Sequence, residues 1–196
     1  WDAPRGFHFV LSCRPGEGRD LVPLLFQYNQ IPAFAGMTDV EGMTAKEGEI
    51  FEISPARESF VAACAHLLKR ATGAALLIDY GHLKSGCGDT LQAVRGHRSV
   101  SIFEDIGDCD LTSHVDFAAL AARAGDARVH GPVGQGDFLK ALGIEARLEN
   151  LLKNATEAQA AALRSGLQRL VASDQMGTLF KVMGLSYGDN VAPPGF

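Results

Sequence analysis

The chain has 196 residues, 46% of them hydrophobic and 21% charged, and its formal net charge at pH 7 is -5. A chain of this length and composition can bury the core of one domain. The acidic balance comes without a run of basic residues or a platform of aromatic and arginine side chains. This argues against nucleic acid or an anionic membrane surface as the main partner.

Four cysteines, Cys13, Cys64, Cys87 and Cys109, are widely spaced and form no C-x-x-C pair. The spacing favours reduced thiols over a disulfide framework or a zinc ribbon. No apolar stretch approaches the roughly 20 residues that a membrane helix needs, and the sequence shows no signal-peptide pattern. The chain begins with Trp1 rather than Met, which suggests a piece of a longer protein.

Residues 6–12 and 48–54 are predicted to be short strands. The segment between them has neither a helical nor a strand period, and its prolines oppose both structures. It resembles the translated interspersed palindromic repeats that lie in frame in some bacterial genes, and GMT occurs in it at 36–38 and 42–44. We interpret residues 13–47 as an in-frame insertion, with an ordinary long loop as the alternative. We expect a cytoplasmic protein of a bacterium.

A helix is predicted to begin at Pro55, with Ser54 as its cap, and to end at Gly73. A buried strand follows at 74–80, and this order of helix and strand is half of a βαβ unit. The apolar face of the helix is expected to hold Phe60, Cys64 and Leu67.

The rest of the chain alternates further helices and strands. Capping-box patterns at Ser113 with Asp116 and at Thr156 with Gln159 mark two helix starts. The final APPGF is expected to be loose. The expected elements are a helix at 112–125, a strand at 127–133, helices at 135–142, 144–153 and 157–172, and a last strand at 177–185.

A carboxylate and a phenol stand at the end of the buried strand, at Asp79 and Tyr80. In open α/β sheets, ligands bind at the carboxyl ends of the strands. Gly81 then allows a sharp turn. We expect Asp79 and Tyr80 to be catalytic. The alternative is that Asp79 only caps the loop after the strand.

The segment GDTLQAVRGH, 88–97, is predicted to be a loop rich in hydrogen-bonding groups. Such a loop binds a polar substrate or closes over a site, or alternatively satisfies its own backbone. Its candidate substrate-binding residues are Asp89, Thr90, Gln92 and His97.

Two further sequence patterns are interpreted as having no metal-binding or cofactor-binding function. Histidines, cysteines and an aspartate gather between residues 82 and 114, but none has a zinc-site spacing, so we expect no metal. The stretch FVLSCRPGEGRDLVPLL, 9–25, imitates a nucleotide-binding turn but lacks the third small residue that packs the helix close. We expect no cofactor there.

Five blocks closely resemble, in unbroken order, the C-terminal half of the MidA-like methyltransferases. These are class I S-adenosylmethionine-dependent enzymes, among them a mitochondrial complex I assembly factor that methylates an arginine of a complex I subunit. The match runs from about Glu49 to Leu185 and includes EISPARES. The blocks are IDYGH (78–82), GDTLQAVRGH (88–97), DLTSHVDFAAL (110–120), GPVGQGDFLKALGIEAR (131–147) and MGTLFKVMGL (176–185).

The resemblance implies an α/β fold, the C-terminal half of a Rossmann-like class I methyltransferase sheet with flanking helices, formed by residues 1–12 and 48–196. It implies methyl transfer from S-adenosylmethionine to a protein arginine, with a complex I subunit as an expected substrate. It places Asp79 and Tyr80 at the crevice as catalytic residues. The substrate-binding residues it implies are His82, Asp89, Thr90, Gln92, His97, Asp116 and Gln135.

The family's glycine-rich cofactor loop, the acidic residue that ends its second strand, and an Asn-Glu-Phe-Asp-Ala-Leu-Pro-type block lie upstream of the matched region. None of them occurs in this chain. We therefore expect no cofactor-binding residue here, and S-adenosylmethionine only in the complete protein. Two alternatives stay open: an inactive fragment of a broken gene, and a non-catalytic module that pairs with a separate N-terminal half.

Overall fold

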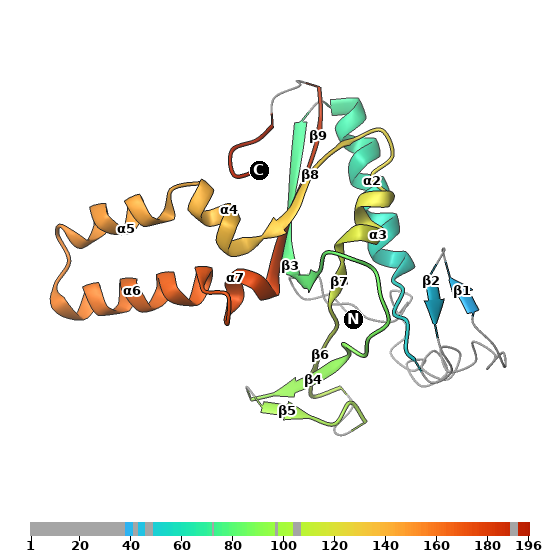
Figure 1. Cartoon of the computed structure of the whole chain (residues 1–196), viewed down its shortest axis with the longest axis horizontal. Coiled ribbons are helices and arrows are strands. Elements are labelled where there is room, and N and C mark those ends of the chain that lie inside the picture. Colours follow the sequence, from blue (N-terminus) through green and yellow to red (C-terminus); the bar gives the residue numbers. More distant parts are fainter. Residues whose placement is uncertain are drawn as a thin grey trace. The chain divides into compact units, whose positions relative to one another are not determined.

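The computed structural model describes residues 38–40, 43–45, 49–71, 73–96, 98–103, 107–188 and 192–196. The chain forms two compact units. The first contains residues 1–58 and 85–114, and the second contains residues 59–84 and 115–196. Helix α2, Pro55–Ala71, begins in the first unit and continues into the second (Figure 1).

The second unit is built on a four-stranded sheet in the order β7-β3-β9-β8 (Figure 1). Its long strands are β3 (Gly73–His82), β8 (Arg128–Gly134) and β9 (Phe180–Tyr187). Strand β9 is antiparallel to both β3 and β8, and the short β7 (Val115–Asp116) runs parallel to the end of β3. The expected α/β class and its late antiparallel strands are confirmed.

The core of the second unit gathers around β9, which lies between β3 and β8. Val182, Met183 and Leu185 of β9 are completely buried. A central strand that is covered on both faces is expected to be almost continuously apolar, as β9 is. Helix α3, Phe117–Ala122, packs against β3 and β8 and buries its Phe117 and Leu120.

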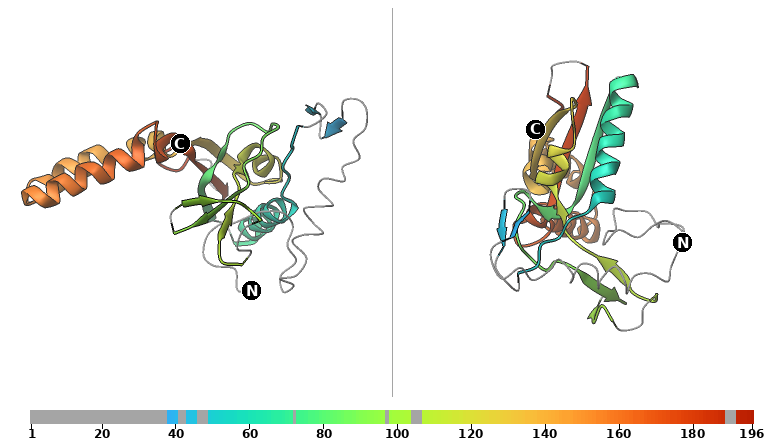
Figure 2. Two further views of the ribbon diagram at one scale, coloured as in Figure 1. Left: turned by 90° about the horizontal axis from the view of Figure 1, so that it is seen from below. Right: turned by 90° about the vertical axis from the view of Figure 1, so that its right-hand side faces the viewer.

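Helix α2 confirms the predicted helix but buries a different face from the one expected. Phe60 and Leu67 are exposed, at 46% and 64% of their surface. Figure 2 shows α2 running beside the sheet. Both faces carry apolar residues at helical spacing, so periodicity alone could not choose between them. The buried face consists of Val61, Ala65 and Leu68.

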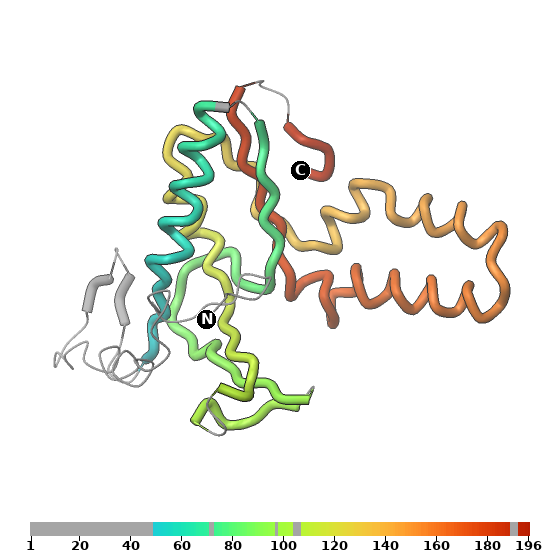
Figure 3. The backbone as a smooth tube through the Cα atoms, turned by 180° about the vertical axis from the view of Figure 1, so that it is seen from behind, coloured from blue at the N-terminus to red at the C-terminus, as the bar shows by residue number. Residues whose placement is uncertain are grey.

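Four helices between β8 and β9 confirm the predicted helical stretch and add a short last helix. The two longest, α5 and α6, lie side by side and extend away from the sheet (Figure 3). The capping box at Thr156 and Gln159 is present at the start of α6. Neither α5 nor α6 holds a buried residue. The helices are α4 (Gln135–Ala141), α5 (Ile144–Leu152), α6 (Glu157–Val171) and α7 (Met176–Leu179).

The first unit contains two small antiparallel sheets. One is the hairpin of β1 and β2, and the other has the order β5-β4-β6. The hairpin lies within the segment predicted to lack regular structure, where Thr and Val favour an extended backbone. Its strands are β1 (Thr38–Val40) and β2 (Met43–Ala45); the second sheet comprises β4 (Gln92–Arg95), β5 (Arg98–Val100) and β6 (Asp110–Thr112).

Two local predictions in the first unit are wrong. The expected strand at 48–54 is reduced to a single bridge between Phe51 and Cys87. The expected loop at 88–97 contains strand β4, which pairs with strands on both sides. In both cases the pairing partner, which a local sequence pattern does not contain, decides whether the backbone is a strand.

The helix expected from residue 112 begins five residues later. Residues 115–116 are taken by β7, and Asp116 is the N-cap of α3, accepting a hydrogen bond from the Ala119 N–H at 2.9 Å. The predicted capping box at Ser113 is therefore wrong, although its second member does the capping. The sequence at 112–116 favours a helix, but pairing with β3 makes residues 115–116 a strand instead.

The final residues are not loose. The ring of Phe196 lies 5.1 Å from that of Phe138 and 5.9 Å from that of His130, measured between ring centres. Gly184 makes room for this ring, since a Cβ there would lie 3.0 Å from Phe196. Burial of an aromatic ring against the sheet offsets the loss of chain freedom.

The predicted strand at 6–12, the sequence motif at 9–25 and His97 lie outside the described residues, as does most of the segment 13–47. Within the described part, no helix has the length and apolar character needed to cross a membrane.

Gly81 lies inside β3 rather than at a turn, because β3 and β7 approach each other there without room for a side chain. A Cβ on Gly81 would lie 2.1 Å from the Val115 carbonyl oxygen. We expect Gly81→Ala to lower the free energy of unfolding by about 2–3 kcal/mol, since the two backbones must separate. Urea denaturation followed by circular dichroism measures this change.

The matched control is Gly166→Ala in the middle of α6, where a Cβ would meet nothing within 4 Å. This variant should raise the free energy of unfolding by about 0.5–1 kcal/mol, because alanine favours a helix more than glycine does. Equal stability of Gly81→Ala and the wild type would contradict the close approach.

Lys181 is a buried cation in β9. Its ammonium group donates hydrogen bonds to the carbonyl oxygens of Thr178 and Leu179. Burial lowers the pKa of Lys181 because it penalises the charged form. The folded state therefore holds this proton less tightly than the unfolded chain does.

We expect Lys181→Met to be at least as stable as the wild type at pH 7 and to lose that advantage near pH 10. A lowered pKa means that the unfavourable charge is fully present below the folded pKa and is relieved as pH rises toward the ordinary value of about 10.4. The measurement is the free energy of unfolding of both proteins at the two pH values.

The pKa of Lys69 is shifted in the opposite direction to that of Lys181. Its effect on the pH dependence of stability must therefore be equal in the two proteins that are compared. Its Nζ lies 2.5 Å from the Asp126 carboxylate, which raises the pKa of Lys69, so its favourable pairing is lost at high pH. Both proteins keep this pair. Lys140→Met, at an exposed lysine, is the control for replacing a lysine by methionine.

Candidate functional site

Asp79 and Tyr80 lie near the carboxyl end of β3, where the sequence placed them. The Asp79 carboxylate accepts a hydrogen bond from the Tyr80 backbone N–H at 2.8 Å. The Tyr80 ring meets Phe180 edge to face, with 5.5 Å between ring centres. Both side chains are partly buried. The phenol is thus held by packing, and the carboxylate is oriented by its own backbone.

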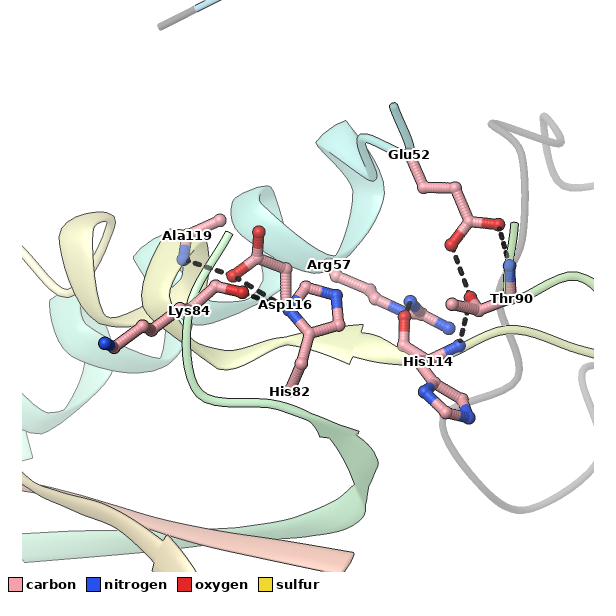
Figure 4. Close-up of polar contacts among 8 residues, drawn as sticks. All are labelled: Glu52, Arg57, His82, Lys84, Thr90, His114, Asp116 and Ala119. Atoms are coloured by element: carbon pink, nitrogen blue, oxygen red, sulfur yellow. Dashed lines mark hydrogen bonds and ion pairs between the residues drawn. The ribbon is translucent and has the colours of Figure 1, made fainter. Parts of the chain in front are cut away.

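His82 and Asp116 are brought together by the pairing of β3 with β7. They are register partners, and His82 Nδ1 lies 4.0 Å from Asp116 Oδ1 (Figure 4). The same ring nitrogen lies 2.8 Å from the Lys84 carbonyl oxygen. Asp116 Oδ1 is held in turn as the N-cap of α3. The two residues form one polar group at the carboxyl end of β3.

Gln135 is buried and its amide is already engaged. Its Nε2 donates to the Leu170 carbonyl oxygen at 2.9 Å, which ties the start of α4 to the last turn of α6. This bond gives a partner to a carbonyl oxygen in the last turn of α6, where the helix itself supplies no N–H donor. The contact gives Gln135 a structural role, alongside the expectation that it binds substrate.

In the first unit, Thr90 is the centre of a hydrogen-bonded group. Both its N–H and its hydroxyl donate to the Glu52 carboxylate, with 2.9 Å between the backbone nitrogen and Oε1. The hydroxyl oxygen also accepts from the His114 N–H at 2.9 Å (Figure 4). Thr90 therefore holds three segments of the first unit together.

Arg57 is a buried residue that sequence reasoning missed. Its guanidinium donates to the carbonyl oxygens of Ser113 and His114 at 3.1 and 2.8 Å and to the Ser113 hydroxyl at 3.2 Å. The signal was available, since Arg57 lies four residues before Val61 on the buried face of α2. An arginine on a buried helix face needs such partners.

The other predicted residues of the first unit are not drawn into this group. Asp89 and Gln92 are exposed, and Gln92 lies in β4. Of the predicted residues, the structure brings His82 and Asp116 together in the second unit, whereas Thr90 in the first unit is bonded to Glu52 and His114. Among the described residues, no three His, Cys, Asp or Glu side chains gather in a way that could hold a metal ion.

The carboxyl end of β3 can bind a donor of hydrogen bonds or a cation. Two carboxylates, an imidazole and a phenol lie there on partly buried residues, and carboxylates orient guanidinium groups through charge-assisted hydrogen bonds.

Comparison with known proteins identifies the family. Residues 12–133 match the family described as "Putative S-adenosyl-L-methionine-dependent methyltransferase". The chain is 37% identical over 134 residues to the Drosophila melanogaster "Protein arginine methyltransferase NDUFAF7 homolog, mitochondrial". It is 36% identical over 115 residues to the Homo sapiens "Protein arginine methyltransferase NDUFAF7, mitochondrial". These matches cover 67% and 58% of this chain.

Two solved structures from Burkholderia thailandensis share the fold. One is bound to S-adenosyl-homocysteine and superposes with a TM-score of 0.70 at 30% identity, over 80% of this chain. The other gives 0.69 at 29% identity, over 96% of this chain.

This chain corresponds to only part of its relatives. It spans 30% of the Drosophila protein and 26% of the human one. It covers 42% and 48% of the two Burkholderia chains. The matched family, the arginine methyltransferase relatives and the shared fold agree with the resemblance read from the five sequence blocks. The chain belongs to the family of S-adenosyl-L-methionine-dependent methyltransferases.

Proposed function

We propose that this chain is the acceptor-side part of an enzyme that transfers a methyl group from S-adenosylmethionine to an arginine of a protein. The observation that carries the proposal is that Asp79, Tyr80 and the pair of His82 and Asp116 all lie at the carboxyl end of β3. Guanidinium recognition by carboxylates supports it, as do the names of the arginine methyltransferase relatives.

We propose that the cofactor is held chiefly by parts of the complete protein other than this chain. The sequence contains neither the family's glycine-rich cofactor loop nor its Asn-Glu-Phe-Asp-Ala-Leu-Pro-type block. We therefore assign no cofactor-holding residue in this chain, and the cofactor belongs to the complete protein.

An open strand edge supports a partner that completes the sheet. Among the described residues, the side of β3 away from β9 is paired only at Gly81 and His82. Leu76 and Ile78 of β3 are also 52% and 43% exposed. An apolar strand with an unpaired edge is prone to pair with another chain. We propose a separately encoded N-terminal half as that partner, in a bacterial cytoplasm.

The test is co-expression of this chain with the N-terminal half of a relative such as the Burkholderia protein. We expect a soluble complex that binds S-adenosyl-homocysteine in calorimetry and methylates an arginine-containing peptide, detected by mass spectrometry. A lysine peptide of the same sequence is the control. A subunit of respiratory complex I is the first protein substrate to try.

Each outcome separates the alternatives. Cofactor binding and methyl transfer support a split enzyme. A soluble complex without methyl transfer supports a non-catalytic interaction module. Persistent insolubility supports the inactive product of a broken gene, because an unpaired apolar edge then finds no native partner.

Asp79→Asn is expected to reduce methyl transfer by about 10²-fold while cofactor binding stays within about twofold, because it removes the charge that would orient a guanidinium. The asparagine oxygen can still accept the hydrogen bond from Tyr80. The measurement is kcat/KM for the peptide together with the Kd for S-adenosyl-homocysteine.

Asp174→Asn, at an exposed carboxylate, is the matched control and should keep the wild-type rate. If Asp79→Asn is as active as this control at equal folded fraction, Asp79 only orients its own backbone.

A further inference from the structure

The side chains of His82 and Asp116 are both held in place by the backbone. The register of β3 with β7 sets the two residues opposite each other. Each side chain then has its own backbone contact, His82 with the Lys84 carbonyl and Asp116 with the Ala119 N–H. The side chains are 33% and 16% exposed, so solvent screens their interaction only in part.

The Lys84 carbonyl decides which ring nitrogen of His82 carries the hydrogen. It lies 2.8 Å from Nδ1, and a carbonyl oxygen can only accept. Nδ1 is therefore the donor, and Nε2 carries the lone pair of the neutral ring. The imidazole is thereby prepared to accept a hydrogen bond or a proton at Nε2.

Asp116 supplies the countercharge for the protonated ring. Its Oδ1 lies 4.0 Å from Nδ1 (Figure 4), and its role as N-cap keeps the carboxylate in that place. The carboxylate therefore stands beside the ring on which a positive charge would form. An imidazole oriented by a third group is the usual arrangement of a general base.

We propose that His82 accepts the proton of the nitrogen that becomes methylated, and that Asp116 is its positioning residue. This rests on the proposed methyl transfer. The N–H bond of the acceptor nitrogen breaks, its electron pair stays on that nitrogen, and the proton bonds to the Nε2 lone pair. The nitrogen uses that pair to bond the methyl group, and the electron pair of the broken S–C bond stays on the sulfur of the methyl donor. The methylated guanidinium keeps its positive charge, and the charge that the sulfonium loses is balanced by the new charge on the imidazole, beside the Asp116 carboxylate.

An arginine side chain holds its proton about six or more pKa units more tightly than an imidazole does. Proton transfer therefore becomes favourable only as the nitrogen gains its new substituent, and a base must already be in contact at that moment. The fixed ring of His82 meets this requirement, whereas a freely rotating surface histidine would not.

The first test needs no activity. NMR correlation of ring protons with ring nitrogens in the ¹⁵N-labelled chain gives the tautomer of His82, and His82→Asn identifies its signals. We expect the neutral ring to carry its hydrogen on Nδ1, the less common form of free histidine. A hydrogen on Nε2 would overturn the proposal.

The second test uses the complex with the N-terminal half. In His82→Asn the side-chain amide can donate to the Lys84 carbonyl as Nδ1 does, but nothing replaces Nε2. We expect kcat to fall by about 10²–10⁴-fold, while KM for the peptide changes little. His66→Asn, at an exposed histidine of α2, is the control and should keep the wild-type rate.

Asp116→Asn separates charge from structure, because asparagine caps a helix as well as aspartate does. We expect unchanged thermal stability and KM but a kcat lower by roughly tenfold, because the carboxylate charge beside the protonated ring is removed. Wild-type kcat in this variant would overturn the role of Asp116.

The role of His82 and the proposed methyl transfer can be overturned by different results. An active wild-type complex with a fully active His82→Asn variant overturns this inference alone. A soluble wild-type complex without methyl transfer overturns the proposed function and the inference with it.

Discussion

The close approach of β3 and β7 at Gly81 is the constraint on which the candidate site depends. With 2.1 Å between a Cβ position and the Val115 oxygen, only glycine permits the two strands to pair. That pairing sets His82 opposite Asp116 and places the Asp116 carboxylate where it caps α3. The glycine at position 81 thus permits the strand pairing that sets the start of α3 and the position of the His82–Asp116 pair.

Helix and strand boundaries that depend on neighbouring residues could be predicted from the sequence. The Thr156–Gln159 capping box and the glycine before α5 set helix boundaries that depend on nothing distant. The strand at 74–80 was also predictable, because its apolar run is bounded by turn residues. Its predicted burial is wrong, since Leu76 and Ile78 are 52% and 43% exposed. The polar residues at its carboxyl end followed from the general position of ligands in α/β sheets.

The wrong predictions concern features that depend on contacts with residues far away in the sequence. The start of α3 moved from Ser113 to Asp116 because β7 pairs with β3. The buried face of α2 depends on what lies against it, and the exposed Phe60 and Leu67 remain a second apolar face. Arg57 was missed for a related reason, since its partners Ser113 and His114 lie far along the chain.

The pairing of β3 with β9 has a consequence during synthesis of the chain. Paired residues are separated by 100 positions at Tyr80 with Phe180 and by 114 at Gly73 with Tyr187. At about 5–20 residues per second, a ribosome makes β9 roughly 5–20 seconds after β3. Throughout that interval β3 lacks the strand that will cover its edge, so a chaperone or an earlier-made polypeptide has time to engage it first.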